Sequence, residues 1–244
     1  MGDRSSVSSL SHPSYASDEQ ESAYLARARA LHWIRFSIAL IILGAATAVV
    51  GCEGAPLHHY KDTVSFEKLW LPLWPLNLDV RQTNALLACG VVIMFQALIY
   101  IVVALIPSPH PRTRLLNFIA STIAVAGLVT AIVGIAFSVY LPSATYPTGF
   151  TSGETIHSWT CKWQSLQGIN ATTVDGQALT APAGFSRDCV ETRAGFILLG
   201  LLIGLEVLMG AAAAAGWLLE QSVTRQRKVG GVELAQVEVT VKKP

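Results

Sequence analysis

The chain has 244 residues, of which 52% are hydrophobic and only 14% are charged, and its formal net charge is +1. Soluble domains carry about 25% charged residues, so this composition excludes an ordinary soluble domain. The near-neutral charge argues against nucleic acid as a partner, because no broad basic face is available to neutralise phosphates. We therefore expect a protein that lies in a lipid bilayer.

Four apolar runs account for this composition, and each is long enough to cross a hydrocarbon core, which takes roughly 17–25 residues. Backbone groups in lipid must be satisfied within their own segment, so each run is predicted to be a helix. The predicted spans are 34–52, 84–106, 115–141 and 194–219. The first run could also be a cleaved signal peptide, but the polar stretch before it is longer than a usual leader. We expect an uncleaved span.

The rest of the chain divides into two tails and two long loops. Residues 1–30 form a Ser-rich tail without a periodic apolar face, so disorder is expected there. Residues 31–219 form the membrane domain, with outer loops at 53–83 and 142–193, and residues 220–244 form a second tail. The predicted fold class is all-α, a four-helix transmembrane bundle with two outer loops, the second closed by a disulfide.

Lys and Arg residues near the span ends predict the orientation, because positive flanks stay on the cytoplasmic side. Basic groups precede the first span, fill the link between the second and third spans, and follow the fourth (Arg27, Arg29, Arg35; Arg112, Arg114; Arg225, Arg227, Lys228). All three groups fall on one side. Both termini are therefore predicted to be cytoplasmic, in the plasma membrane or a secretory-pathway membrane of a eukaryote.

Two features of the second long loop agree with an outward-facing side. Asn170 begins the only N-glycosylation sequon of the chain, where a glycan could be added. Cys161 and Cys189 lie in the same loop, and we predict a disulfide between them that stabilises the fold by roughly 3–4 kcal/mol. Cys52 and Cys89 are expected to be buried thiols, and a bridge that involves Cys52 is the alternative.

The stretch "FEKLWLPLWPLNLDVRQTN", residues 66–84, leads into the second span. Pro72 and Pro75 exclude a long helix and a paired central strand. Trp70 and Trp74 are predicted to be anchors at the membrane–water boundary, where an indole ring is buried and its N–H stays hydrated. A ligand pocket is the less favoured interpretation of the same tryptophans.

Polar and small residues inside the spans predict how the helices pack. Glu206 is the only acid in the fourth span, and Gln96 and Thr130 lie at a similar depth, so we predict an interior polar cluster of these three side chains. Interhelical hydrogen bonding is the favoured role of the cluster, and a proton or cation site is the alternative. Small residues at helix-packing spacing include Gly127, Gly200 and Gly204 and predict a packed bundle, with homodimerisation as the alternative.

No sequence motif predicts an enzyme. The chain has no phosphate loop, dinucleotide fingerprint, nucleophile elbow or HExxH motif, so no catalytic residue and no cofactor are predicted. His58, His59 and His157 lack a fixed ligand spacing, so they are expected to be surface histidines and no metal site is predicted.

Four spans with a cysteine-bearing second outer loop resemble the layout of tetraspanins and claudins, without the signature motifs of either family. The stretch "LWLPLWPLNLDVRQTNALL", residues 69–87, is similar to a recurring segment of uncharacterised small four-span membrane proteins of filamentous fungi. This resemblance implies no known activity. We expect a non-enzymatic membrane protein that organises or accompanies other membrane proteins, of undetermined oligomeric state. The alternative is a small transporter, channel or channel subunit that uses Glu206.

Overall fold

The computed structural model describes most of the chain as helix. It describes residues 18–64, 73–75, 78–106, 113–140, 154–165 and 182–241. The helices are α1 (Asp18–Thr63), α2 (Arg81–Leu105), α3 (Thr113–Tyr140), α4 (Ile156–Ser165) and α5 (Phe185–Val241). Within the described residues the only β-type pairing is an isolated bridge between Asp79 and Thr155. The predicted all-α fold class is confirmed.

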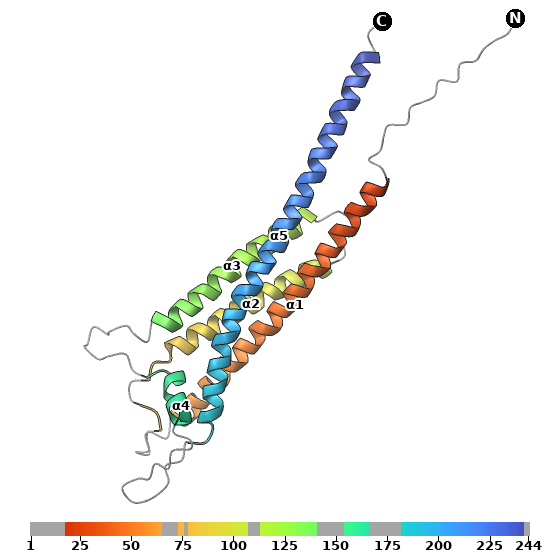
Figure 1. The fold of residues 1–244 in the computed structure, drawn as a ribbon. Coiled ribbons are helices and arrows are strands. Elements are labelled where there is room, and N and C mark those ends of the chain that lie inside the picture. Colours follow the sequence, from red (N-terminus) through yellow and green to blue (C-terminus); the bar gives the residue numbers. More distant parts are fainter. Residues whose placement is uncertain are drawn as a thin grey trace, which may run out of the picture.

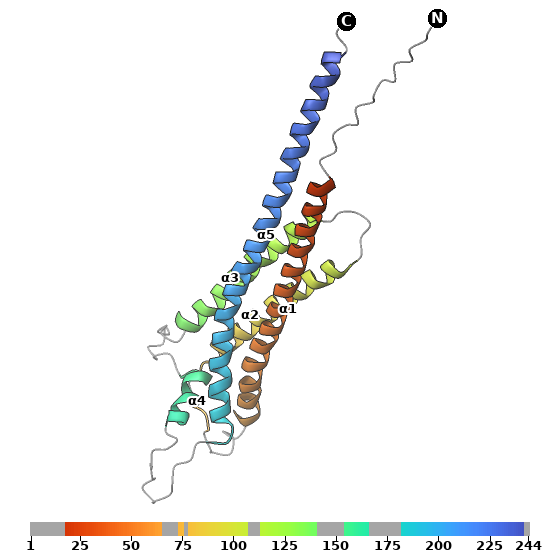
Figure 2. The same cartoon turned by 45° about the vertical axis from the view of Figure 1, so that its right-hand side comes forward.

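Four of these helices are long and apolar enough to cross a membrane, as a multi-pass membrane protein requires. The candidate spans are Leu25–Thr63, Arg81–Leu105, Arg114–Tyr140 and Phe185–Ser222. α1 packs against α2 and α5, and α3 packs against the same two helices, so the bundle has the cyclic order α1–α2–α3–α5. The start of α1 and the end of α5 lie at one end of the bundle and α4 lies at the other (Figures 1 and 2).

Buried residues recur along each spanning helix at alternating spacings of three and four. On α5 the inner row is Thr192, Gly195, Leu199, Leu202, Glu206, Met209, Ala213 and Gly216. On α1 it is Arg35, Ala39, Ile42, Ala46, Val49 and Glu53. A repeat of 3.5 residues keeps one row facing the neighbouring helices only if the helices coil around each other with a left-handed twist. This geometry is that of an ordinary four-helix bundle.

Glycines in these rows allow the helices to approach closely. A Cβ atom added at Gly90 of α2 would lie 3.1 Å from a methyl carbon of Val49 on α1. One added at Gly134 of α3 would lie 2.9 Å from a methyl carbon of Leu199 on α5. Both distances are shorter than ordinary van der Waals contact, so a side chain at either position would require its neighbour to shift, and glycine favours the close approach of the helices.

A second, smaller core lies at the α4 end of the bundle. It consists of Leu57, Trp74, Ile156 and Phe185, and the Trp74 ring centroid is 4.8 Å from that of Phe185. Trp74 is 1% exposed, and its indole N–H donates to Thr63 Oγ1 at 2.8 Å. The prediction that Trp74 is an interfacial anchor is therefore wrong, because its ring fills the space between α1, α4 and α5. The other predicted anchor, Trp70, lies outside the described residues.

A disulfide joins this layer to the bundle, as predicted. Cys161 of α4 and Cys189 of α5 are bonded, with their Cα atoms 4.9 Å apart. The backbone N–H of Asp79 also donates to the carbonyl of Glu154 at 2.9 Å, which ties the segment before α2 to the segment before α4. Cys52 and Cys89 are free thiols. The predicted glycosylation residue, Asn170, lies outside the described residues.

The helices extend further than the predicted spans. α1 begins at Asp18, within the tail expected to be disordered, and continues to Thr63, within the first predicted loop. α5 begins at Phe185 and ends at Val241, within the second tail. Extending an existing helix avoids the cost of nucleation, and the first turns of α1 are rich in Glu, Gln, Ala, Leu and Arg, which favour helix.

Candidate functional site

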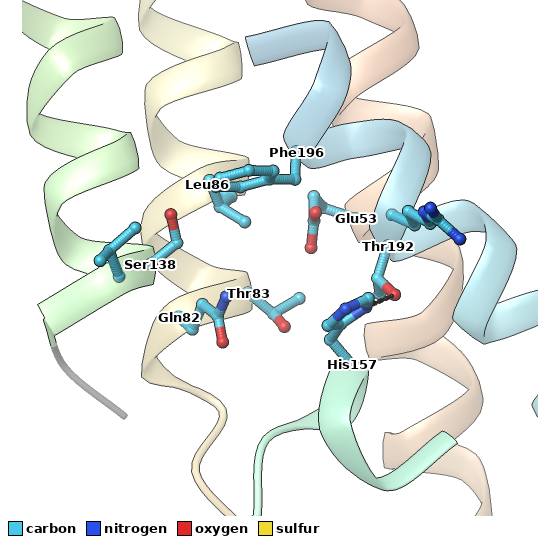
Figure 3. A pocket seen from close by; sticks show the side chains of 10 residues that line it. Glu53, Gln82, Thr83, Leu86, Ser138, His157, Thr192 and Phe196 are labelled. Carbon is cyan, nitrogen blue, oxygen red and sulfur yellow. Dashed lines mark hydrogen bonds between the residues drawn. The ribbon is translucent and has the colours of Figure 1, made fainter. Parts of the chain in front are cut away.

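A mostly apolar cavity of about 210 Å³ lies beside α4, where all five helices contribute side chains. Its lining is Glu53, Gln82, Thr83, Leu86, Ser138, Val139, His157, Thr192, Arg193 and Phe196. Leu86 and Phe196 lie on one side of the cavity, and Thr83 and His157 lie on the opposite side (Figure 3). The cavity therefore combines an apolar wall with a polar one.

Glu53 is the most deeply buried polar residue of the cavity, with 1% of its surface exposed. Within the described part of the chain, its Oε1 atom has no hydrogen-bond partner. The carboxyl group lies against Gly195 of α5, where an added Cβ would be 2.5 Å from Oε1. A buried acceptor without a donor is costly, since folding removes its bonds to water. Glu53 is thus a buried acidic group with one carboxyl oxygen, Oε1, that receives no hydrogen bond from the described residues.

His157 of α4 lies on the polar side of the cavity and is held by α5. The Thr192 hydroxyl donates to the carbonyl of Asp188 at 2.9 Å, so it accepts from Nδ1–H of His157, 2.8 Å away. Burial and the nearby Arg193 guanidinium lower the pKa of His157 below its usual value, which favours the neutral ring. In that neutral tautomer Nε2 is the acceptor. The expectation of a surface histidine is wrong for His157, which is only partly exposed.

His59, also expected on the surface, belongs to the second core instead. Its Nδ1 atom lies 2.5 Å from Oδ2 of Asp188, and its ring contacts those of Trp74 and Phe185 edge-on. Only His58 of the three is exposed. These partners could not be predicted from the sequence, because the residues are far apart along the chain.

The three residues of the predicted intramembrane cluster are not hydrogen-bonded to one another. Both carboxyl oxygens of Glu206 and Oε1 of Gln96 are buried without a hydrogen-bond partner in the described part of the chain. Thr130 donates to the carbonyl of Ala126 in its own helix at 2.8 Å. Glu206 is 1% exposed and lies against Gly127 of α3, so its interior position agrees with the prediction, but the predicted hydrogen bonds are not formed.

The other two glycines predicted to mediate packing do not do so within this chain, and homodimerisation through them stays a prediction. Gly200 and Gly204 are exposed, and a Cβ added to either would have no atom within 4 Å. They lie outside the inner row of α5, which includes Leu199, Leu202 and Glu206. Small-residue spacing recurs on any face of an apolar helix, so the pattern alone did not identify the packed face.

Arg35, considered in the sequence only as a basic flank, is buried at the opposite end of the bundle from the cavity. It is 4% exposed and donates to Asn117 Oδ1 of α3 at 2.5 Å and to the Ala212 carbonyl of α5 at 2.7 Å. Arg35 therefore joins three helices through hydrogen bonds. It contributes to packing in addition to any effect on orientation.

No family model, no curated protein and no solved structure matches the chain. The resemblance of residues 69–87 to four-span proteins of filamentous fungi stays a prediction. Functional residues must therefore be argued from the geometry of this chain itself.

Proposed function

We propose that the protein is a non-enzymatic, multi-pass membrane protein that accompanies or organises other membrane proteins through the layer at its α4 end. One observation carries this proposal. The disulfide, the second core and the pairing of Asp79 with Glu154 together fix α4 on the ends of the bundle. Crossing a bilayer needs no such layer, whereas recognition of a partner benefits from a surface that is held rigid before binding.

In the proposed orientation the α4 layer faces the cell exterior or the secretory lumen and both termini face the cytoplasm. The disulfide supports this side for α4, because disulfides persist in oxidising compartments. The Lys and Arg groups near the other span ends support the cytoplasmic side for the termini. Treatment with a glycosidase tests the orientation. A mobility shift that Asn170→Gln abolishes supports it, and reaction of a tag at either terminus with an impermeant reagent on intact cells contradicts it.

Site-directed photocrosslinking in native membranes tests the partner role. A photoreactive amino acid at exposed Ala183, beside α4, is compared with one at exposed Val129, in the middle of α3. We expect a discrete protein adduct from position 183 that is lost in the Cys161→Ser, Cys189→Ser double variant. Adducts that are the same from both positions, or that do not depend on the disulfide, would contradict a partner surface at α4.

A second candidate, a small transporter or channel subunit, is favoured by Glu206 alone. Its buried carboxyl oxygens have no hydrogen-bond partner in the described residues, as expected of a group that exchanges a proton or cation. Flux in proteoliposomes that is abolished by Glu206→Gln at unchanged thermal stability supports transport. No flux in any variant, with a loss of stability only in Glu206→Ala, supports a packing role.

A further inference from the structure

We propose that the cavity beside α4 binds a small organic cation whose ammonium group pairs with Glu53. This binding site is independent of the proposed partner surface. It follows from the chemistry of the cavity wall, and nothing in the sequence motifs pointed to it.

Glu53 carries a buried hydrogen-bond acceptor without a donor from the described residues. Glu53 is 1% exposed, and its Oε1 atom has no partner among the described residues although its side chain lines the cavity. A primary ammonium group, as in ethanolamine, supplies N–H donors and a positive charge, and hydrogen bonds in which one partner is ionised are about twice as strong as those between neutral groups. A quaternary ammonium group, as in choline, supplies the charge alone. Gly195 has no side chain, and the Glu53 carboxyl group occupies the space that a side chain there would fill. Packing against α5 therefore holds the carboxyl group at the cavity.

The other side chains that line the cavity also suit a cation. The Phe196 ring offers a face for a cation, and the hydroxyl oxygens of Thr83 and Ser138 are acceptors for N–H groups. The neutral His157 ring has Nε2 as a further acceptor, because Nδ1 donates to Thr192. Arg193 also lines the cavity, and its positive charge, which lowers the pKa of His157, opposes a bound cation; its side chain is exposed, so water and salt reduce this repulsion.

The volume of the cavity and its apolar side chains define the class of ligand. At the ~30 Å³ that a water molecule occupies, 210 Å³ accommodates on the order of seven non-hydrogen atoms, the size of ethanolamine or choline. Leu86, Val139 and Phe196 provide carbon contacts that a bare metal ion cannot use. Among the described residues there is also no cluster of three His, Cys, Asp or Glu side chains that could hold a metal ion. The wall therefore fits an ammonium group with a few carbon atoms.

The position of the cavity allows two sources for this ammonium group. Gln82 and Thr83 lie in the first turn of α2, and Ser138 and Val139 lie in the last turn of α3. These are the ends of membrane spans, the depth at which lipid headgroups lie. The ligand is thus either a free solute or the headgroup of a lipid, and the two are separated by experiment.

Thermal unfolding of the purified full-length protein in detergent, titrated with ethanolamine and with choline, tests the proposal. We expect a saturable rise in Tm that sodium chloride at equal ionic strength does not give, since a ligand that binds only the folded state stabilises it. Glu53→Gln keeps the size of the side chain and removes the charge, and we expect it to weaken binding at least tenfold. Asp62→Asn, which removes an exposed carboxylate of the same helix outside the cavity, is the matched control and should bind as the wild type does.

A second variant keeps the test informative if Glu53→Gln does not fold. Phe196→Leu changes a partly exposed side chain and should weaken choline binding severalfold while the folded state is retained.

Native mass spectrometry from nanodiscs of phosphatidylcholine, phosphatidylethanolamine or phosphatidylglycerol then identifies the source of the bound ammonium group. Glu53-dependent retention of a zwitterionic lipid assigns a headgroup, and saturable binding of the free amine without it assigns a solute. Equal binding by wild type and Glu53→Gln, or no binding of either amine or lipid, overturns the proposal.

Discussion

The contact between Glu206 and Gly127 gives the most direct test of the packing inside the bundle. A Cβ atom at Gly127 would overlap the Glu206 carboxyl group, lying 2.5 Å from its Cδ and 2.9 Å from Oε2. Inserting a methyl group into a well-packed interior costs about 1–3 kcal/mol, and the lower part of this range applies here because the displaced atoms end a flexible side chain. We therefore expect Gly127→Ala to lower the free energy of unfolding by an amount in that range.

The same substitution should be much less costly when the carboxyl group is absent. In a Glu206→Ala background, the methyl group of Gly127→Ala enters space that the shortened side chain has left. The coupling energy between the two positions should then be at least about 1 kcal/mol, as is usual for residues in direct contact. The exposed Gly200 provides the control, because a Cβ there meets no atom within 4 Å and Gly200→Ala should be nearly neutral.

Equilibrium unfolding in mixed detergent micelles, followed by the fluorescence of the six tryptophans, measures these free energies. Equal costs of Gly127→Ala in the wild-type and Glu206→Ala backgrounds would refute the reasoning. So would a cost for Gly200→Ala as large as that for Gly127→Ala. Either result would mean that Glu206 does not lie against α3 as described.

Three further predictions concern other parts of the bundle. Arg35→Lys keeps the charge but loses the planar group that reaches Asn117 and the α5 carbonyls, so thermal unfolding should show a loss of about 1–3 kcal/mol. The Cys161–Cys189 disulfide joins residues that are 28 positions apart in the sequence. Its reduction should lower the free energy of unfolding by up to about 3–4 kcal/mol, measured by unfolding with and without reductant. Burial lowers the pKa of His157 in the folded state below its usual 6.5. On acidification the unfolded chain therefore protonates this ring before the folded chain does. The stability contributed by the neutral His157 ring is complete above pH 6.5 and declines as the pH falls. A pH series of Tm should be flatter for His157→Gln, and an unchanged slope would contradict the buried neutral ring.

The number and type of the spanning helices could be predicted from the sequence because lipid imposes a length and a composition on each span. Their ends could not, since Gly54 and Pro56 follow the predicted boundary of residue 52 as helix breakers, yet α1 continues through both. Glu53 lies one residue beyond that boundary, which places it in the first predicted outer loop, 53–83. The helix continues to Thr63, so Glu53 instead faces the interior of the bundle.

The inward face of each helix was also difficult to predict, because lipid-facing and interior positions are both apolar. Leu199 and Leu202 are buried, whereas Leu201 and Leu208 are more than half exposed, and hydropathy does not separate them. The signal that could have separated them is the spacing of polar residues and glycines. On α5, Thr192, Gly195, Glu206 and Gly216 all belong to one row with alternating steps of three and four. Glu206 was selected as an isolated acid, and its relation to this row was missed.

The strict repeat of the inner rows also limits which length changes the spans tolerate. Insertion of one residue between Gly195 and Glu206 would turn the rest of α5 by about 100° relative to its first part. Glu206 would then face the hydrocarbon, at a cost of at least about 2.5 kcal/mol. Whole heptads restore the phase but change the thickness of the bundle, so insertions and deletions that preserve this fold are expected in the connections between the helices.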